Sequence, residues 1–175
     1  VEENPGDVAL KMYNENVYRD SYMDANFNLT PDVVFEASFK LGDDWNTGMS
    51  LIVVQDRGSD GKKNVNAGTL GLNSQGYVTM GNVILCRLST EAYTRISVVH
   101  DDDLGENGSL IIYINGVKVY TYAITNSSFD MPNKIRVAQY NSGIDHGTIF
   151  VDDVIAYTGT EPLEVVDVEL KNGLI

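Results

Sequence analysis

Apolar and polar residues alternate with a period of two along most of this chain, and this pattern constrains the fold more than any other feature. In VVFEASFKL (33–41), the odd-numbered positions carry Val, Phe, Ala, Phe and Leu. Val34, Glu36, Ser38 and Lys40 occupy the other face of the same segment. Because side chains of a strand point alternately to its two faces, this pattern is typical of a half-buried antiparallel strand.

The same periodicity recurs along the sequence and predicts many short strands. Besides 33–41, we expect strands at 9–13, 50–55, 65–72, 77–86, 93–99, 109–115, 117–123, 134–140 and 148–157. Asn115-Gly116 separates two of them and is typical of a tight hairpin, since both residues tolerate positive φ. Clusters of Gly, Asn, Asp and Ser separate the others, and no window predicts a long amphipathic helix. The sequence therefore predicts an all-β fold, a two-sheet antiparallel β-sandwich or jelly roll.

Length and charge exclude several classes of protein. A chain of 175 residues corresponds to one domain at roughly 100–200 residues per domain. The 25 acidic against 12 basic residues give a formal net charge of −13, which argues against a nucleic-acid or anionic-membrane partner. No apolar run is long enough for membrane insertion. One cysteine and two histidines exclude an internal disulfide, a Cys-rich zinc site and a multi-His metal centre.

Both ends of the sequence indicate a module cut from a longer protein. The chain starts at Val1 rather than Met, and its last segment reads TGTEPLEVVDVELKNGLI. That segment combines a turn, an acidic linker and the start of another strand. We therefore expect a jelly-roll domain over residues 1–158, followed by a linker or the start of a further domain over 159–175.

Three segments together resemble the concanavalin A-like lectin/glucanase superfamily, which includes laminin-G-like domains. They are VVFEASFKL (33–41), RISVVHDDDLGENGSLIIYINGVKVYTY (95–122) and IFVDDVIAY (149–157). Each is similar to a strand or hairpin of that superfamily, and their order is the same. The resemblance implies a concanavalin A-like jelly roll with one concave face that carries glycan ligands. It implies no single activity, because this fold hosts lectins, glycosidases, lyases and interaction domains.

Catalytic patterns known from this superfamily are missing. A glycosidase needs two carboxyl groups across the scissile bond, but Asp56 and Asp60 are the only acids in residues 49–72, where the glucanase motif belongs. A lyase needs a base and a group that neutralises a uronate. The Tyr, His and Arg residues of the strands supply those chemical types, yet the alginate-lyase patterns R-x-E-x-R, Q-I-H and Y-x-K-x-G-x-Y-x-Q are absent. We therefore expect no catalytic residues of the familiar kinds.

Carbohydrate recognition needs flat aromatic faces and planar polar groups, and strand parity places several such residues together. The candidate carbohydrate-binding residues are Trp45, Glu36, Tyr93, Arg95, Tyr113, Arg136 and Tyr140. Trp45 lies in the loop GDDWNTG, where it either stacks on a ligand or covers the edge of the sandwich. Glu36 has a second interpretation as a solvated partner in a cross-strand ion pair. An error of one residue in register would invert this face.

The resemblance also implies a structural calcium ion on the convex side of the fold. Asp152 of VDDV matches the aspartate that holds this ion in related proteins, and Asp153 is the adjacent alternative. Glu3 or Asp7 is the expected partner near the N-terminus. Calcium prefers oxygen ligands of this kind. The acidic loop 100–108 lacks the order of an EF-hand and is interpreted as a solvated hairpin loop.

These observations predict a noncatalytic carbohydrate-binding or adhesion module of a secreted or cell-surface multidomain protein. Low cysteine content and acidic, Asn- and Gly-rich loops suggest a bacterial source. The expected partners are a polysaccharide or glycan and the adjacent domains of the same chain. Two alternatives stay open: a polysaccharide lyase or glycoside hydrolase with an unfamiliar site, and a structural spacer or protein-interaction domain.

Overall fold

A computed structural model describes most of the chain and shows strands and connecting segments. It describes residues 2–4, 7–8, 10–13, 22–26, 32–56, 65–140 and 147–163. The strands are β1 (Glu2–Asn4), β2 (Asp7–Val8), β3 (Leu10–Tyr13), β4 (Met23–Asn26), β5 (Val33–Leu41), β6 (Met49–Asp56), β7 (Val65–Leu72), β8 (Tyr77–Met80), β9 (Val83–Arg87), β10 (Thr94–Asp101), β11 (Ser109–Ile114), β12 (Val117–Ala123), β13 (Lys134–Tyr140) and β14 (Thr148–Thr158). Within these residues there is no helix long and apolar enough to cross a membrane.

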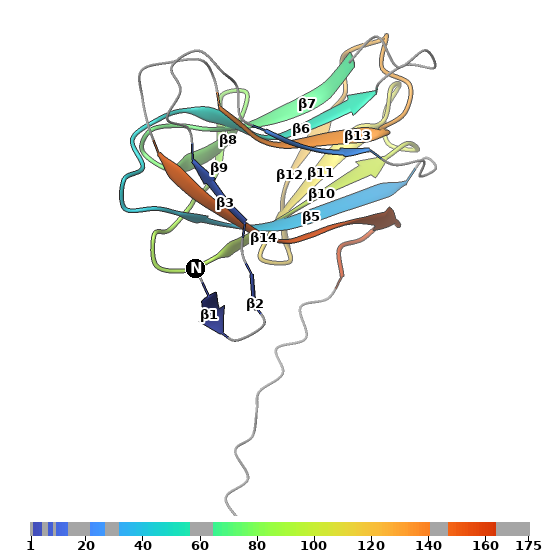
Figure 1. Cartoon of the computed structure of the whole chain (residues 1–175). Helices are drawn as coiled ribbons and strands as arrows, with labels where there is room; N and C mark the ends of the chain where they lie inside the picture. The colour runs from blue at the N-terminus through green and yellow to red at the C-terminus, as the bar shows by residue number, and fades with distance from the viewer. Residues whose placement is uncertain are drawn as a thin grey trace, which may run out of the picture.

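Two six-stranded antiparallel sheets form the two layers of the molecule (Figure 1). The β5 sheet has the strand order β12-β11-β10-β5-β14-β3, and the β6 sheet has the order β4-β13-β6-β7-β8-β9. β1 and β2 pair with each other in a small separate sheet. Strands distant in sequence are neighbours in both layers, as a jelly roll requires. The predicted all-β jelly-roll sandwich is therefore confirmed.

The core lies between the two layers and is built from the apolar face of each strand. Phe35, Ala37 and Phe39 of β5 are fully buried there. Ile135 and Val137 of β13 enter the same core from the other sheet. Because side chains alternate along a strand, the residues between them lie on the outer faces of the sandwich. Those outer faces hold the polar clusters described below.

Several predicted elements agree closely with the structure. β5, β7, β12 and β13 have the predicted bounds, and the predicted hairpin at residues 115–116 joins β11 to β12. Asn115 and Gly116 adopt φ of 49° and 79°, the left-handed conformations that a tight turn of this kind uses.

Other elements differ from prediction. The expected single strand 77–86 is a hairpin, because Gly81 turns the chain between β8 and β9 with φ of 58°. β4 and the short pair β1 and β2 were not predicted, since four or fewer residues carry too little periodicity.

Candidate functional site

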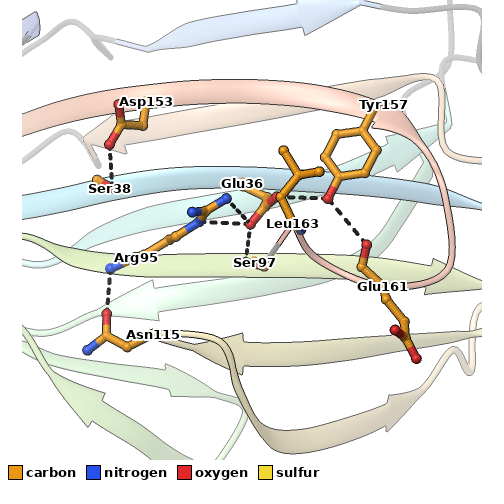
Figure 2. Close-up of polar contacts among 9 residues, drawn as sticks. All are labelled: Glu36, Ser38, Arg95, Ser97, Asn115, Asp153, Tyr157, Glu161 and Leu163. Carbon is orange, nitrogen blue, oxygen red and sulfur yellow. Dashed lines mark hydrogen bonds and ion pairs between the residues drawn. The ribbon is translucent and has the colours of Figure 1, made fainter. Parts of the chain in front are cut away.

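A buried carboxylate organises the outer face of the β5 sheet. Glu36 of β5 is 1% exposed, and all of its carboxylate contacts come from neighbouring elements (Figure 2). One oxygen, Oε2, accepts hydrogen bonds from Arg95 Nε at 2.9 Å and from Ser97 Oγ at 2.7 Å, both on β10. Oε1 accepts from Tyr157 Oη at 2.8 Å and from the Leu163 amide at 3.1 Å. We call these five residues the Glu36 network.

Hydrogen bonding keeps Glu36 ionised despite its burial. Burial by itself raises the pKa of this carboxyl group. Hydrogen bonds from Ser97, Tyr157 and the Leu163 amide, together with the charge of Arg95, outweigh burial and hold the pKa below its ordinary value. The Tyr157 phenol responds in the opposite direction: burial and its hydrogen bond to Glu36 raise its pKa to about 12. A neutral phenol therefore donates to a carboxylate across the ordinary pH range.

The Glu36 network attaches the segment after β14 to the sheet. Tyr157 lies near the end of β14, and Leu163 belongs to the segment that follows. The prediction of a cross-strand ion pair for Glu36 is confirmed, with Arg95 at 2.8 Å as the partner. The prediction that this ion pair is solvated is wrong, because Tyr157 and Leu163 fill the remaining coordination of the carboxylate. A part for Glu36 in carbohydrate binding stays a prediction.

The outer face of the β6 sheet carries a second charged cluster, in which cations outnumber carboxylates. Asp24 of β4 pairs in register with Arg136 of β13, and Lys134 lies two residues before Arg136 on the same face. Arg136 donates from Nε to Asp24 Oδ1 at 2.7 Å and from Nη2 to Oδ2 at 3.0 Å. Lys134 Nζ lies 2.9 Å from Oδ2. We call these three residues the Asp24 cluster; its two cations and one carboxylate carry a net formal charge of +1.

Burial makes the Asp24 cluster electrostatically significant. The side chains of Lys134, Arg136 and Asp24 are 7%, 17% and 22% exposed. The hydrogen bond from Arg136 lowers the pKa of Asp24, and the contacts with Lys134 act in the same direction against the opposing effect of burial. Charges that are withdrawn from solvent are weakly screened by salt. Counted over the described residues, the three side chains of the cluster thus place a net positive charge on one face of a strongly acidic chain.

A buried amide next to the Asp24 cluster has an unpaired oxygen. Gln55 of β6 pairs in register with Lys134, so its side chain lies on the same outer face. Its Nε2 donates to Asn66 Oδ1 at 2.8 Å. Gln55 is 7% exposed, and its buried Oε1 accepts no hydrogen bond from the residues that the structure describes. Because an unsatisfied buried acceptor costs stability, this oxygen calls for a donor that the described residues do not supply.

An exposed tyrosine covers the cation of Arg136. The Tyr22 ring centroid lies 3.7 Å from Arg136 Cζ, a cation–π stacking distance. Tyr22 is 47% exposed, so its other surface is open to solvent. Together with Gln55 and the Asp24 cluster, it places aromatic, amide and charged groups on one face.

The predicted carbohydrate-binding residues fall into three places. Tyr93, Arg95 and Tyr113 belong to the β5 sheet or its margin, whereas Arg136 and Tyr140 lie on β13 of the β6 sheet. The prediction of one shared face is therefore wrong, because strand parity alone cannot tell which of two sheets a strand joins. The side chain of Tyr140 lies outside the described part of the structure. The binding roles of these residues stay predictions.

Trp45, the remaining predicted residue, lies in the segment between β5 and β6. Its indole is partly buried against the core, and Nε1 donates to the Asn73 carbonyl at 3.0 Å. The indole also forms part of the wall of a hollow at this end of the sandwich. Both predicted roles, covering the edge and facing a ligand, are thus compatible with its position.

The predicted calcium ligands lie partly outside the described residues. Asp152 and Asp153 occur at a bulge in β14, where Asp153 has φ of 50°. Asp153 Oδ2 accepts from Ser38 Oγ at 3.1 Å, and Asp152 Oδ1 accepts from the Asp153 amide at 2.8 Å. Glu3 and Asp7 lie on β1 and β2, and their side chains are not described. Among the residues with described side chains, no three acidic, His or Cys groups gather in a metal-binding arrangement, so the calcium site stays a prediction.

Sequence reasoning singled out Arg136 but missed Asp24, Lys134, Gln55 and Tyr22. Lys134 shares the parity of Arg136, so the alternation along 134–140 contained its position. Asp24 and Tyr22 lie on or beside a four-residue strand that has no clear alternation. Gln55 closes an apolar run, and only the register of β6 against β13 reveals its proximity to the cations.

Comparison with known proteins shows a likeness of fold. No family profile matches the sequence, and no curated protein sequence matches it. An endo-β-1,4-glucuronan lyase from the fungus Trichoderma reesei is similar in structure, with a TM-score of 0.60 and 18% identity over 86% of this chain and 81% of the other. Cellulose induced protein, Cip1, gives a TM-score of 0.64 and 16% identity over 89% and 82% of the two chains. Alginate lyase AlyC3 gives a TM-score of 0.59 and 11% identity over 85% of this chain and 74% of the other.

These neighbours include polysaccharide lyases with the jelly-roll sandwich of the concanavalin A-like superfamily. The predicted resemblance is thus supported at the level of the fold. Its laminin-G-like part stays a prediction. In fold, this chain is similar to proteins that include a glucuronan lyase and an alginate lyase.

Proposed function

We propose that this chain is a polysaccharide lyase domain that takes a uronate-containing polymer on the outer face of the β6 sheet. The single observation that carries the proposal is the juxtaposition of a buried, unpaired Gln55 Oε1 with the two cations of the Asp24 cluster. A uronate sugar offers both a carboxylate for the cations and hydroxyl donors for the amide oxygen. This proposal replaces our initial expectation of a noncatalytic module.

The fold of the structural neighbours supports the same choice. Two of the similar structures bear the names glucuronan lyase and alginate lyase. Another neighbour is described as an alginate lyase in complex with an alginate tetrasaccharide, with a TM-score of 0.57 and 14% identity. A fold hosts many functions, so the charged groups on the outer face of the β6 sheet carry the argument and the fold supports it.

The chemistry of elimination matches these groups. A lyase removes the proton from the carbon next to the uronate carboxylate and expels the oxygen on the adjacent carbon. Negative charge develops on the carboxylate as the proton leaves, and fixed cations stabilise it. In this proposal Arg136 and Lys134 hold the carboxylate, and Gln55 accepts a hydrogen bond from a sugar hydroxyl. The Tyr22 oxygen, next to Arg136, is our candidate for proton transfer: as the phenolate it takes the proton from the carbon, and as the phenol it then gives that proton to the departing oxygen.

Binding and turnover are tested separately on the same polymers. The chain is run through gels containing alginate, glucuronan or a neutral glucan, and the ultraviolet absorbance of unsaturated uronate product is followed in solution. We expect retardation by at least one uronate polymer but not by the neutral glucan, and product formation from the same polymer. Absence of retardation by every uronate polymer would contradict the proposal.

Arg136→Gln is the informative variant, and Lys118→Gln is its matched control. Both remove one positive charge, but Lys118 lies exposed on β12 of the β5 sheet. We expect Arg136→Gln to abolish product formation and weaken retardation, and Lys118→Gln to behave as the unchanged protein. Equal effects of the two substitutions would mean that general charge, rather than this cluster, attracts the polymer.

The noncatalytic alternative has one observation in its favour. Both cations of the Asp24 cluster already contact an intramolecular carboxylate, and the sequence lacks the familiar lyase patterns. Retardation by a uronate polymer without any unsaturated product would support a binding module at this same face.

A further inference from the structure

Two adjoining hollows at one end of the sandwich form a continuous groove. The first has a volume of about 520 Å³ and the second about 350 Å³. Leu41, Gly42, Asp43 and Thr90 line both of them. We call the pair the Leu41-end groove, because it lies where β5 ends. Each hollow falls within the usual size range of ligand pockets, and the shared lining joins the two end to end.

The Leu41-end groove has a rigid aromatic wall. Trp45 lines the first hollow, and its Nε1 bond to the Asn73 carbonyl fixes the indole. Gly147 lies directly against the ring: a Cβ at this position would come within 2.9 Å of Trp45 Cε3. Any larger residue would therefore push the indole out of place. An aromatic surface held in this way loses little conformational entropy when a ligand stacks on it.

A second aromatic ring lies at the other end of the groove. Phe150 of β14 lines the second hollow together with Lys40. Lys40 Nζ lies 5.4 Å from the Phe150 ring centroid and 4.9 Å from that of Tyr93. Flat rings at two points along a groove match the repeating CH faces of a sugar chain.

Planar polar side chains share the first hollow with Trp45. Gln75, Arg87 and Glu91 line the first hollow. All three are exposed, and each offers hydrogen-bonding groups of the planar type that recognises sugar hydroxyls. Arg87 is positioned by its Nε bond to the Gln75 carbonyl at 3.2 Å. A concave site with aromatic walls and a few fixed polar groups is the usual form of a ligand site.

The charged side chains that line the groove carry a small net negative charge. Asp43, Asp44 and Glu91 contribute three negative charges to its lining, and Lys40 and Arg87 contribute two positive ones. The resulting net charge of −1 opposes a uronate chain, in contrast to the Asp24 cluster. A neutral glycan meets no such repulsion.

We propose that the Leu41-end groove is a second carbohydrate-binding site, specific for a neutral polysaccharide chain and distinct from the outer face of the β6 sheet. Ile135, which lies between the two cations of the Asp24 cluster in sequence, lies near Val33 at the start of β5. The groove lies at Leu41, the other end of this strand. Eight residue steps of about 3.3 Å separate the two ends by roughly 25 Å. The domain thus engages an uncharged polymer at one end while it binds a uronate polymer elsewhere.

Trp45 is the only tryptophan of the chain, so its fluorescence reports on this groove alone. The intact chain is titrated with neutral cello-, xylo- and manno-hexasaccharides and, separately, with uronate oligomers. We expect a saturable change in tryptophan emission with at least one neutral hexasaccharide and none with the uronate oligomers. No change with any neutral hexasaccharide, or a change with uronate oligomers alone, would overturn the proposal.

Gln75→Ala is the test variant, and Asn82→Ala is its matched control. Both residues are exposed and both lose a side-chain amide, but Asn82 lies in the turn between β8 and β9, outside the groove. Gln75→Ala is expected to weaken binding about fivefold, as for one lost hydrogen bond, whereas Asn82→Ala leaves it unchanged. An equal affinity in the two variants would mean that the ligand binds outside the groove and would contradict the proposal.

Arg136→Gln separates this inference from the proposed lyase function. Because Arg136 lies on the outer face of the β6 sheet, this substitution should leave the fluorescence titration with the neutral hexasaccharide unaltered. Loss of the fluorescence response in Arg136→Gln would mean that both ligands depend on the same site and would contradict the inference. If the uronate assays fail, the fluorescence titration with neutral hexasaccharides still tests the groove by itself.

Discussion

Both outer faces of the sandwich carry a carboxylate paired with an arginine, but the two pairs differ in what surrounds the carboxylate. On the β5 sheet, the Glu36 carboxylate meets one guanidinium and three neutral donors, and every one of these contacts is internal. On the β6 sheet, the Asp24 carboxylate meets two cations, and a neighbouring amide oxygen has no donor. A carboxylate–arginine pair is therefore no indicator of a ligand site by itself. The surplus of charge and the unmet hydrogen bond distinguish the face that is open to a ligand.

The comparison predicts its largest effect for loss of the carboxylate in the Glu36 network. Glu36→Ala leaves Arg95 without its partner and removes the acceptor for four donors. We expect the free energy of unfolding to fall by about 3 kcal/mol, as when one member of a buried ion pair is removed. Chemical denaturation measures this change, and the exposed Glu106→Gln serves as the control. A loss as small as that of the control would show that the network contributes little to stability.

A smaller loss of stability is expected at both ends of the pH scale. The folded-state pKa of Glu36 is lowered, so its contribution is present above the ordinary carboxyl value of about 4.3 and is lost as pH falls through the folded value. The pKa of Tyr157 is raised to about 12, so its contribution is present below the ordinary phenol value of about 10 and is lost as pH rises toward 12.

Urea midpoints measured against pH check both limbs of this curve. Glu36→Gln should flatten part of the acid limb; the lowered pKa of Asp24 accounts for a further part. Tyr157→Phe should remove the contribution of this phenol to the alkaline limb. If the curves of both variants coincide with that of the unchanged chain, the Glu36 network is not the origin of its pH-dependent stability.

On the β6 face, Asp24→Asn is predicted to strengthen binding of a uronate polymer. It raises the formal charge of the cluster from +1 to +2, which should improve affinity roughly threefold at low ionic strength and little at high salt. Affinity electrophoresis at two salt concentrations measures the effect. Weaker binding would mean instead that Asp24 positions the two cations and that their orientation matters more than their charge.

The smallest effect on stability is expected for Gln55. Gln55→Met removes an unpaired buried oxygen together with one hydrogen bond to an exposed asparagine, so we expect unfolding free energy to change by no more than about 0.5 kcal/mol. Retardation by a uronate polymer should nevertheless weaken. Ser97→Ala in the Glu36 network is the contrasting variant, with an expected cost of about 2 kcal/mol. Equal costs of the two substitutions would abolish the distinction between the faces.

The alternation of residues was sufficient to predict the fold but not the assembly of the site. From Val33 to Leu41 the odd positions of β5 are all apolar, and the bounds of the strand match the prediction, although Val34, Glu36 and Ser38 on its other face are buried as well. The site depends instead on which strand lies beside which. Arg95 and Arg136 have similar strand contexts in sequence, yet they lie on different sheets. Long-range pairing of β4 with β13 brings Asp24 to Arg136 across 112 positions, and no local pattern encodes that distance.

The anchor at Leu163 tolerates wide variation in sequence. Its contribution to the Glu36 network is a main-chain N–H, and its side chain is exposed. Almost any residue can therefore occupy this position, whereas proline, which lacks an amide hydrogen, would remove this contact and leave the bond from Tyr157 Oη to the Glu161 carbonyl at 3.2 Å. For protein engineering, the side chain at position 163 can therefore be replaced while its main-chain contact with the sheet is kept.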